Sequence, residues 1–192
     1  MSSRFSTSLA ATLLLTGLVV GTPAAAQNPQ VRDGFWIGFG LGYGSANGSC
    51  DGCGSSDSES GLTGHLKLGG TLSPKVLLGA ESDVWMKEIN GATNTVGNFS
   101  GTVYFYPSPA GGFFLKGGAG LAYYSVSEGN VSVSKAGLGL MGGAGYDVRV
   151  GRNISITPMA TFRYAGVGDI EELGVVGASF TVLDLGVGVT FH

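Results

Sequence analysis

The sequence predicts an all-β protein in which eight antiparallel strands run up and down around a transmembrane β-barrel. Three observations indicate this fold. Apolar side chains alternate with glycine or polar ones, connections alternate between short and long, and charged residues make up only 12% of the chain, whereas about 25% is usual in soluble domains. A soluble sandwich would bury the apolar face of such strands, but a barrel in lipid exposes it.

The alternation is clearest in residues 35–43. One face of this segment carries only large apolar side chains, and the other carries Trp36 followed by glycines alone. Successive side chains of a strand point to opposite faces. The segment is therefore predicted to be a strand with one apolar face and one nearly bare face.

The first 26 residues have the features of an export signal. Arg4 gives a weakly basic start, residues 9–20 form an apolar run, and residues 23–26 are small enough for cleavage before Gln27. The apolar run is shorter than the roughly 20 residues that a spanning helix needs. We expect residues 1–26 to be removed and residues 27–192 to form one barrel domain.

The remaining strands follow from the same period-two pattern. The eight predicted segments are 34–45, 61–72, 76–87, 96–106, 112–125, 136–150, 154–166 and 177–191. Short turns follow the second, fourth and sixth segments, and longer polar stretches follow the others, the longest at 46–60. This alternation is typical of outer-membrane barrels with short periplasmic turns. It predicts a cell outer-membrane location with both termini in the periplasm.

Charged side chains fall on the parity opposite to the apolar one, as required if the other parity touches hydrocarbon. An eight-stranded barrel has an interior just wide enough for side chains, and unpaired buried charges are costly. We therefore expect a paired polar network in the lumen, although an ion or small-solute path is the alternative. Its predicted members are His65, Lys67, Glu81, Asp83, Lys116, Asp147, Arg149, Arg163 and Asp184.

Pro158 lies in the seventh segment, where its missing N–H should leave a gap in the strand ladder.

Aromatic residues gather at both ends of the segments and predict two interfacial belts. They are Phe35, Trp36, Phe105, Tyr106, Phe113, Phe114 and Phe191 at the short-turn ends, and Tyr43, Trp85, Phe99, Tyr123, Tyr124 and Tyr164 at the long-loop ends.

Residues 184–191 carry a polar residue, a glycine two positions on, and spaced hydrophobic positions ending in an aromatic one. Together with residues 113–121, they make the chain resemble the small eight-stranded outer-membrane barrels of the OmpA/OmpX and opacity type. The resemblance implies an assembly signal at Asp184, Gly186, Val189 and Phe191 that is read by the barrel-assembly machinery. His192 departs from the pattern, because the aromatic residue is usually the last one.

Cys50 and Cys53 lie in the predicted first long loop. In an exported protein two nearby cysteines most simply form a disulfide, while metal binding and redox chemistry remain alternatives. A zinc site needs four ligands, and no second pair of Cys or His lies nearby in the sequence.

The net charge of −3 and the absence of a basic run argue against a nucleic-acid partner, and no pattern indicates a cofactor. His65 and His192 are the only histidines, and neither has an evident serine and carboxylate partner pattern. We expect a non-enzymatic outer-membrane barrel in contact with lipid, with a structural or adhesive role for its extracellular loops. The alternatives are a narrow channel and, less favoured, a lipid A-modifying enzyme. A soluble lipocalin-like barrel is the main rival fold.

Overall fold

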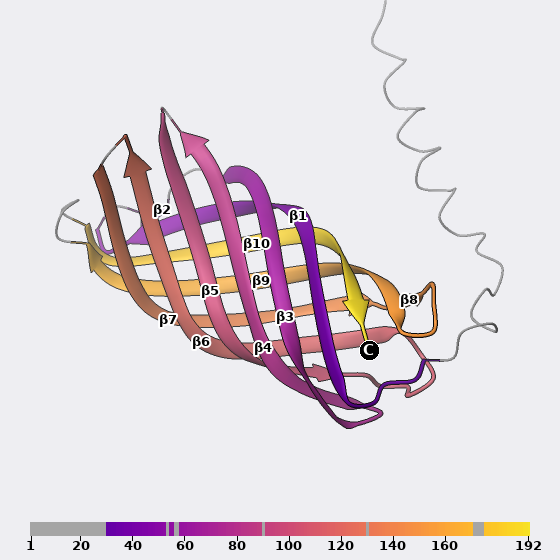
Figure 1. The fold of residues 1–192 in the computed structure, drawn as a ribbon. Helices are drawn as coiled ribbons and strands as arrows, with labels where there is room; N and C mark the ends of the chain where they lie inside the picture. Colours follow the sequence, from indigo (N-terminus) through magenta and orange to yellow (C-terminus); the bar gives the residue numbers. More distant parts are fainter. Residues whose placement is uncertain (1–29, 53, 56–57, 90, 130, 171–174) are drawn as a thin grey trace, which may run out of the picture.

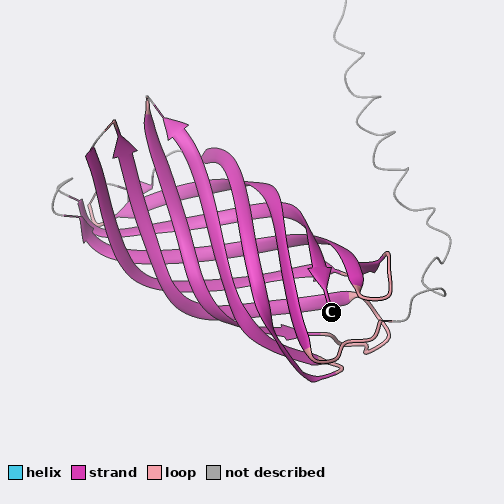
Figure 2. Cartoon of the chain, in the orientation of Figure 1, coloured by secondary structure: helices cyan, strands magenta, loops and turns pink. Residues whose placement is uncertain are grey.

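The computed structural model describes residues 30–192 except 53, 56–57, 90, 130 and 171–174. The predicted export signal, residues 1–26, lies outside the described residues. In the described part of the chain, no helix has the length and apolar character needed to cross a membrane. The ribbon consists of strands and the segments that connect them (Figure 2).

Eight long strands and two very short ones make up the fold (Figure 1). In chain order they are β1 (Phe35–Cys50), β2 (Gly54–Ser55), β3 (Glu59–Ser73), β4 (Val76–Ile89), β5 (Ala92–Phe105), β6 (Phe113–Glu128), β7 (Val131–Tyr146), β8 (Val148–Arg149), β9 (Ile154–Ile170) and β10 (Val175–Phe191).

The long strands form one closed antiparallel ring, because β1 pairs with β10 on one side and with β3 on the other. Paired residues can be followed once around the ring from Ile37 to Asn47, which gives a shear of 10 residues. The path runs through Leu68, Ala80, Gly101, Ala119, Leu140, Tyr164 and Thr181. This stagger tilts the strands and sets the width of the interior. The predicted eight-stranded up-and-down barrel is confirmed.

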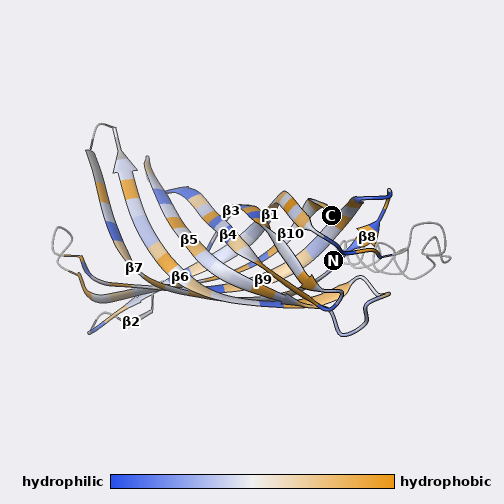
Figure 3. Cartoon of the chain, turned by 60° about the horizontal axis from the view of Figure 1, so that its bottom comes forward, coloured by the Kyte–Doolittle hydropathy of each residue, from blue (hydrophilic) through white to orange (hydrophobic). Residues whose placement is uncertain are grey.

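The outward face of the barrel is apolar, as the alternation predicts. Ile37, Leu140 and Val187 are 36%, 56% and 56% exposed. Every long strand contributes at least one such residue, for example Leu41, Leu66, Leu78, Phe99, Leu121, Leu140, Phe162 and Leu185. Hydrophobic and hydrophilic positions alternate along the strands in Figure 3. This is the arrangement of a barrel surrounded by hydrocarbon.

The polar stretches predicted as long loops are for the most part strand, which corrects the predicted boundaries. Only two residues separate β4 from β5, and only two separate β6 from β7. Gly91 and Gly129 lie in these turns with φ of +84° and +57°, a conformation that glycine adopts without steric cost. We call this side of the barrel the hairpin end. The opposite side, with the turns at 74–75, 106–112 and 150–153, is the short-turn end.

The predicted sixth strand, 136–150, is interrupted at Asp147 between β7 and β8. The pairs on either side, Gly145 with Met159 and Val148 with Ile156, keep one register along β9. In this register Tyr146 lies opposite Pro158 and Asp147 opposite Thr157, so the gap begins opposite Pro158, which has no N–H to donate to the ladder. The backbone N–H of Asp147 instead donates to the carbonyl of Gly112, at 2.9 Å.

The predicted aromatic belts are only partly correct. Trp36, Trp85, Tyr106 and Phe114 are buried and point into the lumen. Trp36, Trp85 and Phe114 lie on the inward parity of their strands, and Tyr106 directly follows β5. Tyr124 also faces inward, where its ring stacks on Phe180. The rings that remain exposed are Phe35, Phe105, Phe113 and Phe191 at the short-turn end, and Tyr43, Phe99, Tyr123 and Tyr164 toward the hairpin end.

The outward orientation predicts a strong dependence on position along one strand. Val187 and Val176 both lie in β10 and are 56% and 55% exposed, but Val176 lies near the hairpin end. Val187→Arg is expected to destabilise the barrel by about 2–4 kcal/mol, and Val176→Arg by about 0–1 kcal/mol, because the cost of arginine falls away from the bilayer midplane. Urea unfolding in phospholipid vesicles measures both. Equal costs would contradict the proposed membrane band.

Candidate functional site

The lumen is filled by side chains in successive layers. Near the short-turn end lies a cluster that we call the aromatic plug, consisting of Trp36, Leu77, Tyr104, Tyr106, Phe114 and Met159. Toward the hairpin end lies the upper plug, consisting of Ala46, Trp85, Val96, Ala122, Ala165 and Val182. Charged residues occupy the space between the two plugs. Inward-facing apolar residues therefore close the interior at two levels, in addition to the polar residues that the sequence places there.

Four charged side chains of the belt between the plugs form two ion pairs. The ammonium group of Lys116 lies 2.5 Å from Glu81, and both side chains are fully buried. The hydroxyl of Tyr104 donates a further hydrogen bond to Glu81. On the other side, Arg163 donates to Asp184 at 2.7 Å. Lys116 and Glu81 come from β6 and β4, and Arg163 and Asp184 come from the neighbouring strands β9 and β10, so each pair ties two strands together.

Lys67 and Asp83 complete the belt. Lys67 is buried, and its ammonium group lies 5.2 Å from the ring centre of Tyr104 and 5.5 Å from that of Phe114. These distances suit a cation–π interaction. Asp83 is buried on β4 in register with His65 and Asn98. Six of the eight predicted lumen charges thus gather in this belt.

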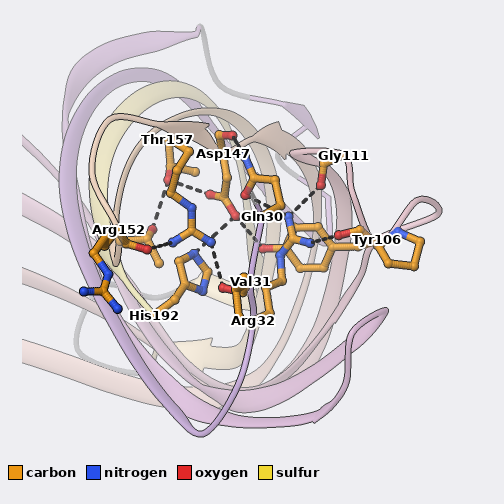
Figure 4. A network of polar contacts seen from close by, with 12 residues as sticks. Gln30, Val31, Arg32, Tyr106, Gly111, Asp147, Arg152, Thr157 and His192 are labelled. Atoms are coloured by element: carbon orange, nitrogen blue, oxygen red, sulfur yellow. Dashed lines mark hydrogen bonds and ion pairs between the residues drawn. The ribbon is translucent and has the colours of Figure 1, made fainter. Parts of the chain in front are cut away.

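The other two predicted lumen charges, Asp147 and Arg149, are buried at the short-turn end. Figure 4 shows the network around Asp147, and Arg149 donates to the carbonyl of Val31 at 2.8 Å. Asp147 accepts hydrogen bonds from the hydroxyls of Tyr106 and Thr157, each at 2.8 Å. The imidazole of His192 lies 3.5 Å from the same carboxylate. His192, the residue that departs from the assembly-signal pattern, therefore packs its side chain inside the barrel.

The segment before β1 joins this network and closes the short-turn end (Figure 4). Arg32 lies 3.6 Å above the ring of Tyr106 and donates to the carbonyls of Pro109 and Gly111 at 3.0 and 2.7 Å. The side chain of Gln30 donates to the carbonyl of Asp147 at 2.9 Å. We call this arrangement the N-terminal latch. Sequence reasoning missed Arg32, because the residue lies outside any strand and no periodic pattern indicates that it faces inward.

The glycines of β1 are explained by what occupies the space beside them. A Cβ added at Gly38 would meet the side chain of Lys67 at 2.7 Å, and one added at Gly40 would meet His65 at 2.5 Å. Side chains from the neighbouring strand thus lie across the bare inner face of β1. Glycine here makes room for side chains inside a narrow barrel.

His65 shows no arrangement for nucleophilic catalysis. It is half-buried on β3 against Gly40 and Gly188, and its Nε2 atom has no hydrogen-bond partner among the described residues. A catalytic histidine is expected to contact its serine nucleophile. The described residues also contain no group of three or more His, Cys, Asp or Glu side chains that could hold a metal ion.

Two predictions remain, the disulfide of Cys50 with Cys53 and the assembly signal in β10. Cys50 ends β1 at the hairpin end, but Cys53 lies outside the described residues, so the disulfide stays a prediction. Asp184 and Gly186 lie within β10, and Val189 and Phe191 lie near its short-turn end. Phe191 faces outward beside Phe39, with ring centres 6.4 Å apart. Their role as an assembly signal also stays a prediction.

The buried pair of Lys116 and Glu81 gives a direct test of the charged belt. Lys116→Met is expected to destabilise the barrel by about 3–5 kcal/mol, because it leaves Glu81 as an uncompensated buried charge. Adding Glu81→Gln should recover part of this loss, since the two residues are coupled. Urea unfolding in vesicles of the two single variants and the double variant measures the coupling. Strictly additive losses would show that the pair is not a unit.

Comparisons with known proteins agree with this geometry. Residues 11–191 match the family model described as the outer membrane protein beta-barrel domain, whereas no curated protein matches the chain in a sequence search. Among solved structures, the fold is similar to Ail, the attachment invasion locus protein of Yersinia pestis, with a TM-score of 0.59 and 14% identity over 83% of this chain and 99% of that one. It is also similar to Ail in complex with a heparin analogue, with a TM-score of 0.52 and 17% identity over 82% and 99% of the two chains.

Neisserial surface protein A is a further structural relative. Its TM-score is 0.57 at 16% identity, over 84% of this chain and 98% of that one. At such low identities these similarities concern the fold alone. The family match covers nearly the whole chain, and the closed ring, apolar outer face and filled lumen agree with it. The protein therefore belongs to the outer-membrane β-barrel family and resides in the outer membrane in contact with lipid.

Proposed function

We propose that the protein is a non-enzymatic surface barrel, which holds its hairpin end outside the cell to contact an external ligand or surface. The observation that carries this proposal is the length of the strands. They have 14–17 residues, whereas about 9–11 tilted residues cross a bilayer. With the short turns in the periplasm, several residues of every strand extend beyond the hydrocarbon.

These extensions form a rigid rim rather than a set of long loops. Backbone hydrogen bonds continue through β4 and β5 as far as the pair of Ile89 with Ala92. A partner that binds a pre-ordered surface loses less conformational entropy than one that must order flexible loops. The extended hairpins thus suit the presentation of a fixed binding surface.

The charge of the rim narrows the kind of partner. Its described side chains include four acidic residues and two lysines, namely Asp51, Glu59, Glu88 and Asp169 against Lys87 and Lys135. Ail, a fold relative, was solved with the heparin analogue sucrose octasulfate. Complementary charge favours association, so for this protein we expect neutral or cationic partners rather than polyanions.

Trimming one hairpin tests the surface role. Met86 pairs with Thr95, so replacing residues 87–94 by Asn-Gly should keep that pair and close a tight hairpin. We expect the variant barrel to keep its heat-dependent gel shift, because the spanning part is intact. Bacteria that express the trimmed variant should adhere less to host cells or to matrix-coated surfaces.

A second variant trims the hairpin of β6 and β7 by replacing residues 127–132 with Asn-Gly, since Val126 pairs with Val133. If neither trimmed variant, nor both changes combined, reduces adhesion by cells that display the protein, the surface role is wrong.

A narrow channel is disfavoured by the two plugs and the N-terminal latch. In planar bilayers the protein is expected to give no defined single-channel steps, because Trp36, Phe114 and Trp85 are buried inside the lumen at two levels. Reproducible steps of one conductance would overturn this expectation and favour the channel. Absence of lipid A hydrolysis or acyl transfer by the purified protein would likewise agree with a non-enzymatic role.

A further inference from the structure

A cleft opens in the lumen at the hairpin end, beside the upper plug. Its volume is about 280 Å³, and it is lined by residues of β1, β3, β4, β5, β6 and β10. Because these strands come from different sides of the ring, the cleft lies across the mouth of the barrel. The residues that matter for binding are Glu59, Trp85, Ile89, Asn94, Tyr124 and Phe180.

The aromatic walls of this cleft are held in place by contacts within the protein. The indole N–H of Trp85 donates to the carbonyl of Gly44 at 3.1 Å. Tyr124 stacks on Phe180, with ring centres 4.3 Å apart and an interplanar angle of 21°. The hydroxyl of Tyr124 donates to the side chain of Asn94 at 2.8 Å. A ligand would meet rings that are already ordered, which lowers the entropic cost of binding.

The polar groups of the cleft favour a positive charge. Glu59 is the only charged side chain among the described residues that line it. Its partner Lys87, at 3.2 Å, does not line the cleft, and both side chains are partly exposed. Such solvated ion pairs contribute little energy, so another cation can replace Lys87. Aromatic faces also attract cations, and most of the other rim charges are acidic.

We propose that this mouth cleft binds a small organic cation, a primary ammonium that carries one aromatic ring or a short alkyl group. The apolar part lies against Trp85, Tyr124 and Phe180, and the ammonium group pairs with Glu59. A cleft of this volume accepts a single ring with a short chain. The proposal does not rest on the adhesive role of the rim, although Ile89 and Asn94 of the β4–β5 hairpin contribute to the cleft.

The two tryptophans of the chain make the test direct. Trp36 lies in the aromatic plug and Trp85 lines the cleft, so Trp36→Phe leaves Trp85 as the only reporter. The purified barrel is titrated in detergent at pH 7 with 2-phenylethylamine, which is protonated, and with 2-phenylethanol, which is neutral. We expect a saturable change in Trp85 fluorescence for both, with the amine binding about fivefold more tightly or better, as expected for added charge pairing and cation–π attraction.

Two rim carboxylates supply matched variants. Glu59→Gln should weaken amine binding about fivefold and leave alcohol binding unchanged, whereas Glu88→Gln should change neither, because Glu88 does not line the cleft. Both positions lie at the hairpin end, where neither change should affect folding. Ala46→Phe places a ring in the cleft and should abolish the saturable response to both compounds, which separates binding from partition into the micelle.

The proposal would be overturned by the absence of a saturable response with the amine, by equal affinities for the amine and the alcohol, or by equal effects of Glu59→Gln and Glu88→Gln. The heat-dependent gel shift of every variant shows whether the barrel is folded. A variant barrel that is folded but retains full amine binding after Ala46→Phe would place the ligand elsewhere and contradict the assignment.

Discussion

The closing of β1 against β10 is the constraint on which the rest of the structure depends. In hydrocarbon no water can satisfy an unpaired backbone N–H or C=O, so a sheet can span the membrane only when it has no free edge. The 13 residue pairs from Ile37 with Phe191 to Ser49 with Ser179 close the ring. Once the ring is closed with a shear of 10, the width of the interior is set, and every inward side chain must fit within it.

This narrow interior explains both the glycines and the layers of the lumen. Large side chains such as Lys67 and His65 lie across β1 only because Gly38 and Gly40 have no Cβ in their way. Unpaired charges are costly in so small a space, and Lys116 pairs there with Glu81 and Arg163 with Asp184. Rings fill the space above and below the charged belt. The resulting barrel is closed inside, so its proposed functions lie at the rim and at the mouth cleft.

Much of the fold could be predicted because each strand separates two environments. Alternation in residues 35–43 and the inward parity of Glu81, Lys116 and Arg163 follow directly from that separation. The hairpins at the rim were predicted as loops, because polar residues outside the membrane lose the alternation although the backbone pairing continues. The dipeptides Asn90-Gly91 and Gly129-Asn130 are turn signals that could have indicated them.

The arrangement inside the lumen was harder to predict for a physical reason. Parity tells which residues face inward, but the height and register of each strand decide which of them meet. Parity therefore places Asp147 in the same predicted network as the charges of the belt, although it binds Tyr106 and Thr157 at the short-turn end. Arg32 was missed because its place depends on carbonyls about 80 residues away in the sequence, at Pro109 and Gly111.

The most direct test of the central claim is a nitroxide scan along β10 of the barrel in lipid vesicles. Single cysteines at residues 182–189, in a background without Cys50 and Cys53, carry the label, and its collision rates with oxygen and with a water-soluble nickel complex are measured. The account predicts oxygen contact at positions 183, 185, 187 and 189, and little contact with either reagent at the positions between them. Uniform accessibility, or oxygen contact at the even positions, would contradict it.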